Sequence, residues 1–174
     1  MYRIILIGPR SVGKSTVGKI IAEKLKLKYF DLDGFVTERL GDIDEFISMH
    51  TLEEYRKQES HLLKELLGKL PREYVISIGG GTIASQFHGL SEINAELLKK
   101  KGTFVFINPS YDKKEGPKAL FDKEKERKGN KSFSDIKKLF EIRQPIYEKY
   151  AEITVLTMNK SPEQVAGEII TRFK

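Results

Sequence analysis

Apolar residues fall along the chain in two alternating patterns. Short runs rich in β-branched and aromatic residues predict five buried strands, at residues 2–7, 28–32, 74–78, 103–107 and 152–157. Apolar positions spaced three and four apart predict helices at residues 14–25, 52–70, 92–101 and 134–150, and a last helix after Ser161. Since strand and helix alternate, we expect an α/β fold with a mostly parallel sheet and helices on both of its faces.

Two of the predicted helices have recognisable starts. Thr51 is followed three residues later by Glu54, and Ser161 is followed by Pro162 and then Gln164. A hydroxyl residue three positions before Glu or Gln is typical of a helix N-terminus, and proline suits the first helical position. The sequence shows no repeat and no linker, so residues 1–174 are expected to form one domain.

Composition narrows the class of protein. The 174 residues, 39% hydrophobic and 32% charged, suit a soluble globular domain. No apolar run approaches the length of a bilayer span and the first residues do not resemble a secretory leader, so we expect a cytoplasmic protein without a membrane partner. The absence of cysteine excludes disulfides, thiolate catalysis and cysteine-ligated metals, and the three histidines lack the spacing of metal ligands.

The net charge of +6 permits nucleic acid, an acidic membrane surface or a small polyanion as a partner. Residues 113–131 contain eight Lys and Arg against four Asp and Glu, so this segment carries four of the excess positive charges. A charged run of this kind is usually a solvated, mobile loop. The alternative is a lid, at about residues 111–131, that closes over phosphate groups.

A glycine-rich motif follows the first predicted strand. Residues 8–15 fit G-x-x-x-x-G-K-[ST], the loop whose backbone N–H groups bind the phosphates of a nucleotide at a helix N-terminus. Lys14 then supplies charge to the β- and γ-phosphates, and the Ser15 hydroxyl is a ligand for Mg²⁺. The motif predicts ATP and Mg²⁺ as cofactors, with ATP bound by Gly8, Arg10, Ser11, Val12, Gly13, Lys14, Ser15 and Thr16.

Two carboxylates close the second predicted strand. Because side chains alternate along a strand, Asp31 and Asp33 are expected to point the same way, toward the edge that holds the phosphate loop. A cap on a helix beginning at Gly34 is the structural alternative for Asp33. The third strand runs into Gly79, Gly80 and Gly81 instead of an acidic residue, which leaves Asp31 for magnesium.

No glutamate in the motif set is placed to orient a water molecule, so transfer to a bound hydroxyl is favoured over hydrolysis. Asp33 is the residue expected to accept or orient the proton of that hydroxyl. Arg56 and Glu59 continue the apolar stripe of their helix, where an inward arginine, held by the glutamate, can bind an anion. Arg143 is a second arginine, and Pro145 after it is expected to kink or end its helix.

Taken in order, the phosphate loop, Asp31 and Asp33, Tyr55-Arg56 with Glu59, the three glycines, and Arg143-Gln-Pro-Ile-Tyr147 resemble the motif set of shikimate kinases. The resemblance implies a three-layer P-loop kinase fold, like nucleoside monophosphate kinases, with parallel strand order 2-3-1-4-5. It assigns Ser15 and Asp31 to magnesium and Asp33 to the ring hydroxyls. It also implies that Arg56 and Arg143 hold the shikimate carboxylate, and that Gly79, Gly80 and Gly81 line its ring.

The chain departs from this family in two segments. Thr51-Leu52 stands where the family has Gly-Glu, and Gly116-Pro117-Lys118 stands where the lid has Arg-Pro. Lys118 is therefore expected to bring the missing charge to the transferred phosphoryl group, with Lys113, Lys114 and Arg127 as alternatives. Substrate contacts are expected from about residues 33–63.

The sequence thus predicts an ATP-dependent kinase of a small carboxylated polyol, with shikimate the acceptor that the resemblance implies. A kinase for another small acid or a nucleotide is one alternative. A non-catalytic module that binds nucleotide or nucleic acid through residues 113–131 is the other. For the kinase we expect a monomer with a small-molecule acid as partner and no nucleic acid.

Overall fold

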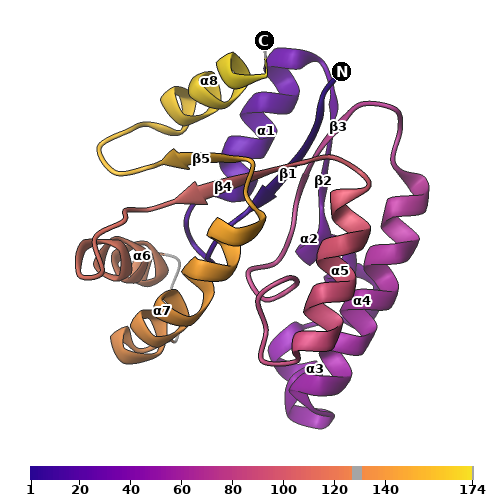
Figure 1. The fold of residues 1–174 in the computed structure, drawn as a ribbon. Coiled ribbons are helices and arrows are strands. Elements are labelled where there is room, and N and C mark those ends of the chain that lie inside the picture. Colours follow the sequence, from indigo (N-terminus) through magenta and orange to yellow (C-terminus); the bar gives the residue numbers. More distant parts are fainter. Residues whose placement is uncertain (127–130, 174) are drawn as a thin grey trace.

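The computed structural model describes residues 1–126 and 131–173, with a five-stranded sheet at its centre (Figure 1). All four neighbouring pairs are parallel, in the order β2-β3-β1-β4-β5. The expected α/β fold and strand order are confirmed. The strands are β1 (Arg3–Ile7), β2 (Lys28–Asp31), β3 (Tyr74–Ser77), β4 (Thr103–Asn108) and β5 (Ile153–Leu156).

Helices cover both faces of the sheet (Figure 1). One core packs α2, α4 and α5 against the sheet, the other packs α1, α6 and α8, and α7 contributes to both. None of the helices in the described residues is long and apolar enough to cross a membrane. Their bounds are α1 (Lys14–Leu25), α2 (Leu32–Leu40), α3 (Ile43–Met49), α4 (Leu52–Lys69), α5 (His88–Lys99), α6 (Glu115–Glu126), α7 (Phe133–Tyr150) and α8 (Pro162–Arg172).

The central strand shows why the sequence pattern predicted buried strands. Ile5 and Ile7 of β1 belong to one core, while Ile4 and Leu6 belong to the other. All four side chains are buried, because side chains alternate across a sheet that is covered on both faces. A continuous apolar run therefore marks a strand of this sheet, and its carboxyl end leads directly into the phosphate loop.

Both predicted helix starts are confirmed. The Thr51 hydroxyl accepts a hydrogen bond from the Glu54 backbone N–H at 3.0 Å. Ser161 and Gln164 form a reciprocal capping box ahead of α8, with Pro162 at its first position. These bonds satisfy backbone donors that the first turn of a helix leaves without a partner.

The predicted helices did not include α2, α3 or α6, and the start of α5 differs from the prediction. Helix α5 begins at His88, four residues before the predicted start at Glu92. Helix α3 was not predicted, although Ile43, Phe46 and Ile47 are spaced three and four apart and pack half-buried against the core. Residues 115–126, within the segment 113–131 expected as a mobile loop, form α6, because Gly116, Leu120 and Glu124 recur every four residues and form a buried face between charged residues. Residues 127–130 of that segment lie outside the described residues.

Pro145 does not end its helix. Helix α7 continues through it to Tyr150. An internal proline costs about 3 kcal/mol in a helix, because it removes a backbone hydrogen bond and crowds the preceding turn. Tyr147 is only 1% exposed and packs in the core beyond Pro145. Its burial offsets much of that cost, since burying a large side chain contributes about 1.5–3 kcal/mol.

The packing of α6 can be tested with two substitutions on the same helix. Leu120→Ala should lower the free energy of unfolding by about 2–3 kcal/mol, because Leu120 is buried against the core. Lys118→Ala, on the exposed face, should change it by less than about 0.5 kcal/mol. Urea denaturation measures both. Equal, near-zero effects would mean that residues 115–126 form a loose loop in solution.

Candidate active site

The carboxyl ends of β1, β2 and β3 meet around one large cavity of about 1220 Å³. The loop after β1, the carboxylates after β2 and the three glycines after β3 all contribute to its wall. Helices α4 and α7 add Arg56 and Arg143 from farther along the chain. The topology therefore brings together nearly all the predicted site residues. Those on the wall are Arg10, Ser11, Val12, Gly13, Lys14, Ser15, Thr16, Asp31, Asp33, Arg56, Gly79, Gly80, Gly81 and Arg143.

The phosphate loop has the backbone that its motif requires. Gly8 and Gly13 have φ angles of 143° and 100°, which L side chains rarely adopt. A Cβ atom on Gly8 would also lie 2.5 Å from the Ile107 carbonyl oxygen. Lys14 is 8% exposed, and its Nζ donates to the carbonyl oxygens of Gly8 at 2.9 Å and Pro9 at 2.8 Å. The loop thus holds the ammonium group at its centre.

The two predicted magnesium ligands lie side by side. The Ser15 hydroxyl donates to Asp31 Oδ2 at 3.1 Å. Tyr29 donates to the same oxygen at 3.2 Å and lies 2.5 Å from the Ser77 hydroxyl. Burial raises the pKa of Tyr29 to about 12, so its hydroxyl keeps the proton with which it orients Asp31. Sequence reasoning had not assigned Tyr29 a place in this site.

The relation between Asp31 and Asp33 differs from the prediction. Strand β2 ends at Asp31, and Asp33 belongs to the first turn of α2, which begins at Leu32. Asp31 is the residue that caps this helix, with Oδ1 accepting from the Asp33 backbone N–H at 3.2 Å. The chain turns into the helix before strand alternation can align the two side chains, yet both still reach the cavity.

The Asp33 carboxyl is open to the cavity but enclosed by its walls. Burial raises its pKa from the ordinary 3.8. The positive charge of Lys14 opposes this rise in pKa, and the negative charge of Asp31 reinforces it. Gly79 makes room for it, because a Cβ atom at that position would lie 2.6 Å from Asp33 Oδ1. A carboxyl with a raised pKa beside a phosphate loop is suited to proton transfer.

Arg56 and Glu59 form a buried ion pair on the inward face of α4. The Nη1–Oε2 distance is 2.6 Å, and the two side chains are 13% and 1% exposed. Burial alone would lower the pKa of Arg56, but the charge and hydrogen bond of Glu59 raise it. The guanidinium therefore stays charged. A Cβ atom on Gly81 would lie 2.5 Å from Arg56 Cζ, so the glycine allows the guanidinium to reach the cavity.

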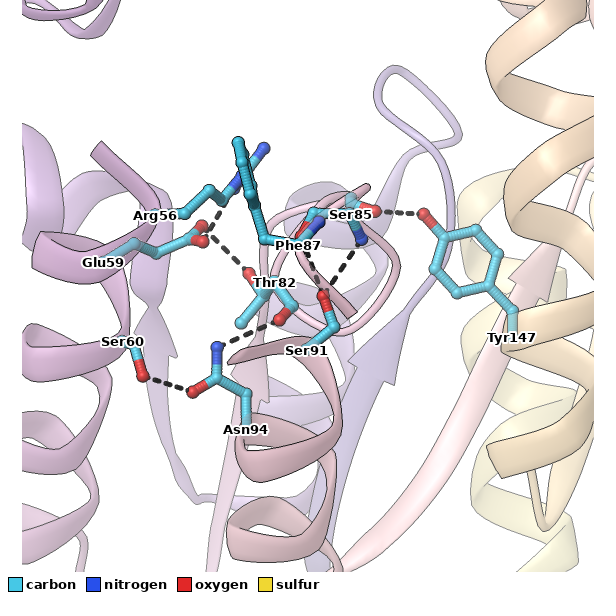
Figure 2. A network of polar contacts seen from close by, with 10 residues as sticks. Arg56, Glu59, Ser60, Thr82, Ser85, Phe87, Ser91, Asn94 and Tyr147 are labelled. Atoms are coloured by element: carbon cyan, nitrogen blue, oxygen red, sulfur yellow. Dashed lines mark hydrogen bonds and ion pairs between the residues drawn. The ribbon is translucent and has the colours of Figure 1, made fainter. Parts of the chain in front are cut away.

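Helix α7 meets the same glycine turn from the other side. The Tyr147 hydroxyl donates to the Gly80 carbonyl oxygen (Figure 2). Burial raises the pKa of Tyr147 to about 12, so it remains a donor. Arg143, one turn earlier, lies 3.4 Å by its Nη1 from the place of a Cβ atom on Gly80. Residues far apart in sequence therefore surround the three glycines.

Lys118 does not join these residues. It lies on the exposed face of α6, outside the cavity lining, because Gly116, Leu120 and Glu124 occupy the opposite, buried face. Lys123 and Lys131 line the cavity instead. Lys113 and Lys114 are exposed and also off the wall, and Arg127 lies outside the described residues.

Glu124 is a site residue that sequence reasoning missed. It is 2% exposed and accepts a hydrogen bond from the Ser11 hydroxyl at 2.6 Å. Arg10 Nε lies 3.3 Å from its other oxygen. These contacts join α6 to the phosphate loop, whose Ser11 has a φ angle of 65°. The four-residue repeat from Gly116 to Glu124 could have indicated that Glu124 faces inward.

Known proteins resemble this chain in sequence and in structure. The family model described as shikimate kinase matches residues 10–174. The chain belongs to the shikimate kinase family. The shikimate kinase of Enterococcus faecalis is 32% identical, over 100% of this chain and 99% of that protein.

Solved structures of the family have the same fold. The shikimate kinase of Acinetobacter baumannii, in complex with shikimate, matches with a TM-score of 0.82 and 25% identity over 98% of this chain and 91% of that one. That of Aquifex aeolicus matches with a TM-score of 0.75 and 34% identity over 98% and 95% of the two chains. The family resemblance inferred from the motifs is therefore confirmed.

The contact between Gly81 and Arg56 predicts the effect of one added methyl group. Gly81→Ala should push the guanidinium out of place, while the fold survives because the obstructing group is the end of a flexible side chain. We expect the KM for the acidic acceptor to rise at least about tenfold, with the KM for ATP unchanged. Steady-state kinetics with each substrate varied measures this. An equal loss for both substrates would contradict a local effect on Arg56.

Proposed function

We propose that this protein transfers the γ-phosphoryl group of ATP to a hydroxyl group of shikimate, giving shikimate 3-phosphate. The observation that carries the proposal is the single cavity in which a phosphate loop, Asp33 and two arginines, Arg56 and Arg143, face one another across a glycine turn. A nucleotide and a small carboxylate can both be accommodated there. Membership of the shikimate kinase family supports shikimate as the acceptor.

The phosphate loop fits ATP with magnesium. Lys14 would hold the β- and γ-phosphates, and Ser15 with Asp31 would contribute to the metal site through hard oxygen donors. No group of three or more His, Cys, Asp or Glu side chains that could hold a metal occurs in the described ranges, so phosphates and water would complete the coordination. Bound Mg²⁺ would neutralise negative charge on the phosphates.

The far side of the cavity suits the nucleoside part of ATP. Leu120, Pro162 and Val165 give it apolar walls beside the polar groups of Thr157 and Lys160. An aromatic base can be buried among the first three, while the polar groups meet its edge or the ribose. These residues come from α6, α8 and the loop before α8, on the phosphate-loop side of the sheet.

The acceptor half is built around residues 33–63 and the glycine turn. Arg56 and Arg143 would hold the carboxylate of shikimate through charge-assisted hydrogen bonds, and the buried Arg56 Nε, which has no partner among the described residues, supports a missing acceptor here. Gly79, Gly80 and Gly81 would lie along the ring. Asp33 would take the proton of the attacking hydroxyl.

In this proposal, four basic side chains on the cavity wall supply positive charge around the transferred phosphoryl group. Lys14 and Arg10 belong to the phosphate loop, and Lys123 and Lys131 flank the cavity within the lid segment 111–131. Lys118 is left out because it faces away from the wall.

An acceptor panel tests the function. Wild-type protein with ATP and Mg²⁺ should release ADP in the presence of shikimate, with kcat/KM at least about tenfold higher than for quinate or gluconate. Lys14→Ala should lower kcat at least about a hundredfold with an unchanged circular dichroism spectrum, because its charge stabilises the transition state. A preference for gluconate or a nucleotide would identify a different kinase.

Failure of every acceptor to stimulate ADP release would favour the non-catalytic alternative. In that case the protein should bind nucleic acid with an affinity that falls steeply as salt rises.

The Asp33 carboxyl predicts a pH dependence. A general base must be deprotonated, so kcat/KM should fall as pH drops through the pKa of Asp33. Since burial raises that pKa, the acid limb should lie above the pH expected for an ordinary carboxyl of pKa 3.8. Asp33→Asn should remove this limb and lower kcat about a hundredfold or more. A limb that persists unaltered in Asp33→Asn would assign the titration to another group.

A further inference from the structure

A chain of buried polar side chains begins at Glu59, the partner of Arg56, and extends away from the cavity (Figure 2). It runs from α4 through the segment after β3 to α5. Its members are almost fully buried, with exposed fractions of 1% for Glu59, 4% for Ser60, 1% for Thr82 and 2% for Asn94. Buried polar groups need hydrogen-bond partners, and a network in which they are satisfied holds its side chains in one geometry.

Both oxygens of Glu59 are engaged. Oε2 accepts from Arg56 at 2.6 Å, and Oε1 accepts from the Thr82 hydroxyl at 3.0 Å (Figure 2). An ion pair alone would leave the carboxylate able to rotate about its last bond. The second hydrogen bond removes that freedom and so fixes the direction in which Glu59 holds the guanidinium.

Thr82 is itself held by its backbone. Its N–H donates to the Gly79 carbonyl oxygen at 3.1 Å, and its own carbonyl oxygen accepts from Asn94 Nδ2 at 3.0 Å. Asn94 Oδ1 in turn accepts from the Ser60 hydroxyl at 2.6 Å, which ties α5 back to α4. These bonds to the glycine turn and to helices α4 and α5 fix the backbone of Thr82, and so orient its hydroxyl toward Glu59.

We propose that Thr82, held by Asn94, is a positioning residue for acceptor recognition. Its hydroxyl orients Glu59, and Glu59 orients Arg56 toward the acceptor carboxylate. The Arg56 guanidinium packs closely against Gly81. A small rotation of the Arg56–Glu59 ion pair therefore displaces the guanidinium from its place in the cavity. This inference rests on the proposed function, since it needs an anionic acceptor at Arg56.

Two substitutions at one position separate the hydroxyl from the packing. Thr82→Val keeps the shape but leaves a Glu59 oxygen without its donor, whereas Thr82→Ser keeps the donor. Thr82→Val should weaken shikimate binding about tenfold or more, with the KM for ATP within twofold of wild type. Thr82→Ser should restore the affinity to within about threefold. Titration calorimetry with shikimate and kinetics in ATP measure the two effects.

The role through Arg56 is tested by combining changes. In an Arg56→Ala background, Thr82→Val should add less than twofold to the loss of acceptor affinity, because the residue it positions is gone. If the losses of acceptor affinity from Arg56→Ala and Thr82→Val multiply in the double variant, Thr82 acts by a route that does not involve Arg56. Equal acceptor affinities of Thr82→Val and Thr82→Ser would also contradict a role for the hydroxyl.

Ser91→Ala is the matched control. Ser91 is a buried hydroxyl of the same helix as Asn94, and it bonds the Ser85 backbone and hydroxyl at 3.1 and 2.8 Å without touching Glu59 or Thr82 (Figure 2). Its loss should leave shikimate affinity within twofold. A tenfold loss in this control would mean that any disturbance of α5 weakens the site, which would overturn the specific role of Thr82.

The outcomes distinguish this inference from the proposed function. Wild-type protein that neither binds nor phosphorylates shikimate would overturn both. Normal wild-type binding with an unchanged affinity in Thr82→Val would overturn the positioning role alone. If Thr82→Val does not fold, Thr82→Ala removes the same hydroxyl without a new clash and gives the same measurement.

Discussion

The close approach of the glycine turn after β3 to charged side chains is the constraint on which the site depends. Cβ atoms at Gly79 and Gly81 would collide with Asp33 and Arg56. The turn also receives Tyr147 from α7 at the Gly80 carbonyl. Backbone without side chains therefore lets groups from three helices reach one cavity at the edge of the sheet. A larger residue at either position would separate the proton acceptor or the guanidinium from the phosphate loop.

Burial of charge explains why the site keeps its geometry. An unpaired charge in the interior is expensive, and each buried charge named here has hydrogen-bond partners. Lys14 bonds loop carbonyls, Glu59 bonds Arg56 and Thr82, and Glu124 bonds Ser11 beside Arg10. Loss of one contact leaves a buried charge with fewer hydrogen-bond partners. The groups are thus fixed before substrate enters, so little reorganisation is needed during phosphoryl transfer.

The strand order came from the family resemblance. Periodicity and a local motif were enough to predict a mostly parallel sheet, most helices and the phosphate loop. These features depend on residues that are neighbours in sequence. Helix α6 was not predicted, because charged residues surround its narrow buried face of Gly116, Leu120 and Glu124. Asp31, and not Asp33, caps the following helix, because β2 ends at Asp31 and α2 begins at Leu32; the sequence pattern did not mark this boundary. Thr82 and Asn94 carry no motif at all, since their contacts join segments that only the folded chain brings together.

The packed helix α6 also changes how the positive charge of its segment relates to the site. A mobile lid would bring any of its lysines to the phosphates, whereas a docked helix presents only those on one face. Gly116 and Leu120 fix that face against the core, and Glu124 fixes it against the phosphate loop. Because Glu124 is an anion beside a loop built for phosphate, the adjacent Arg10 keeps the pair close to neutral. Lys113, Lys114 and Lys118 lie off the cavity wall, so the sequence count of +4 overstates the charge that this segment offers to a nucleotide.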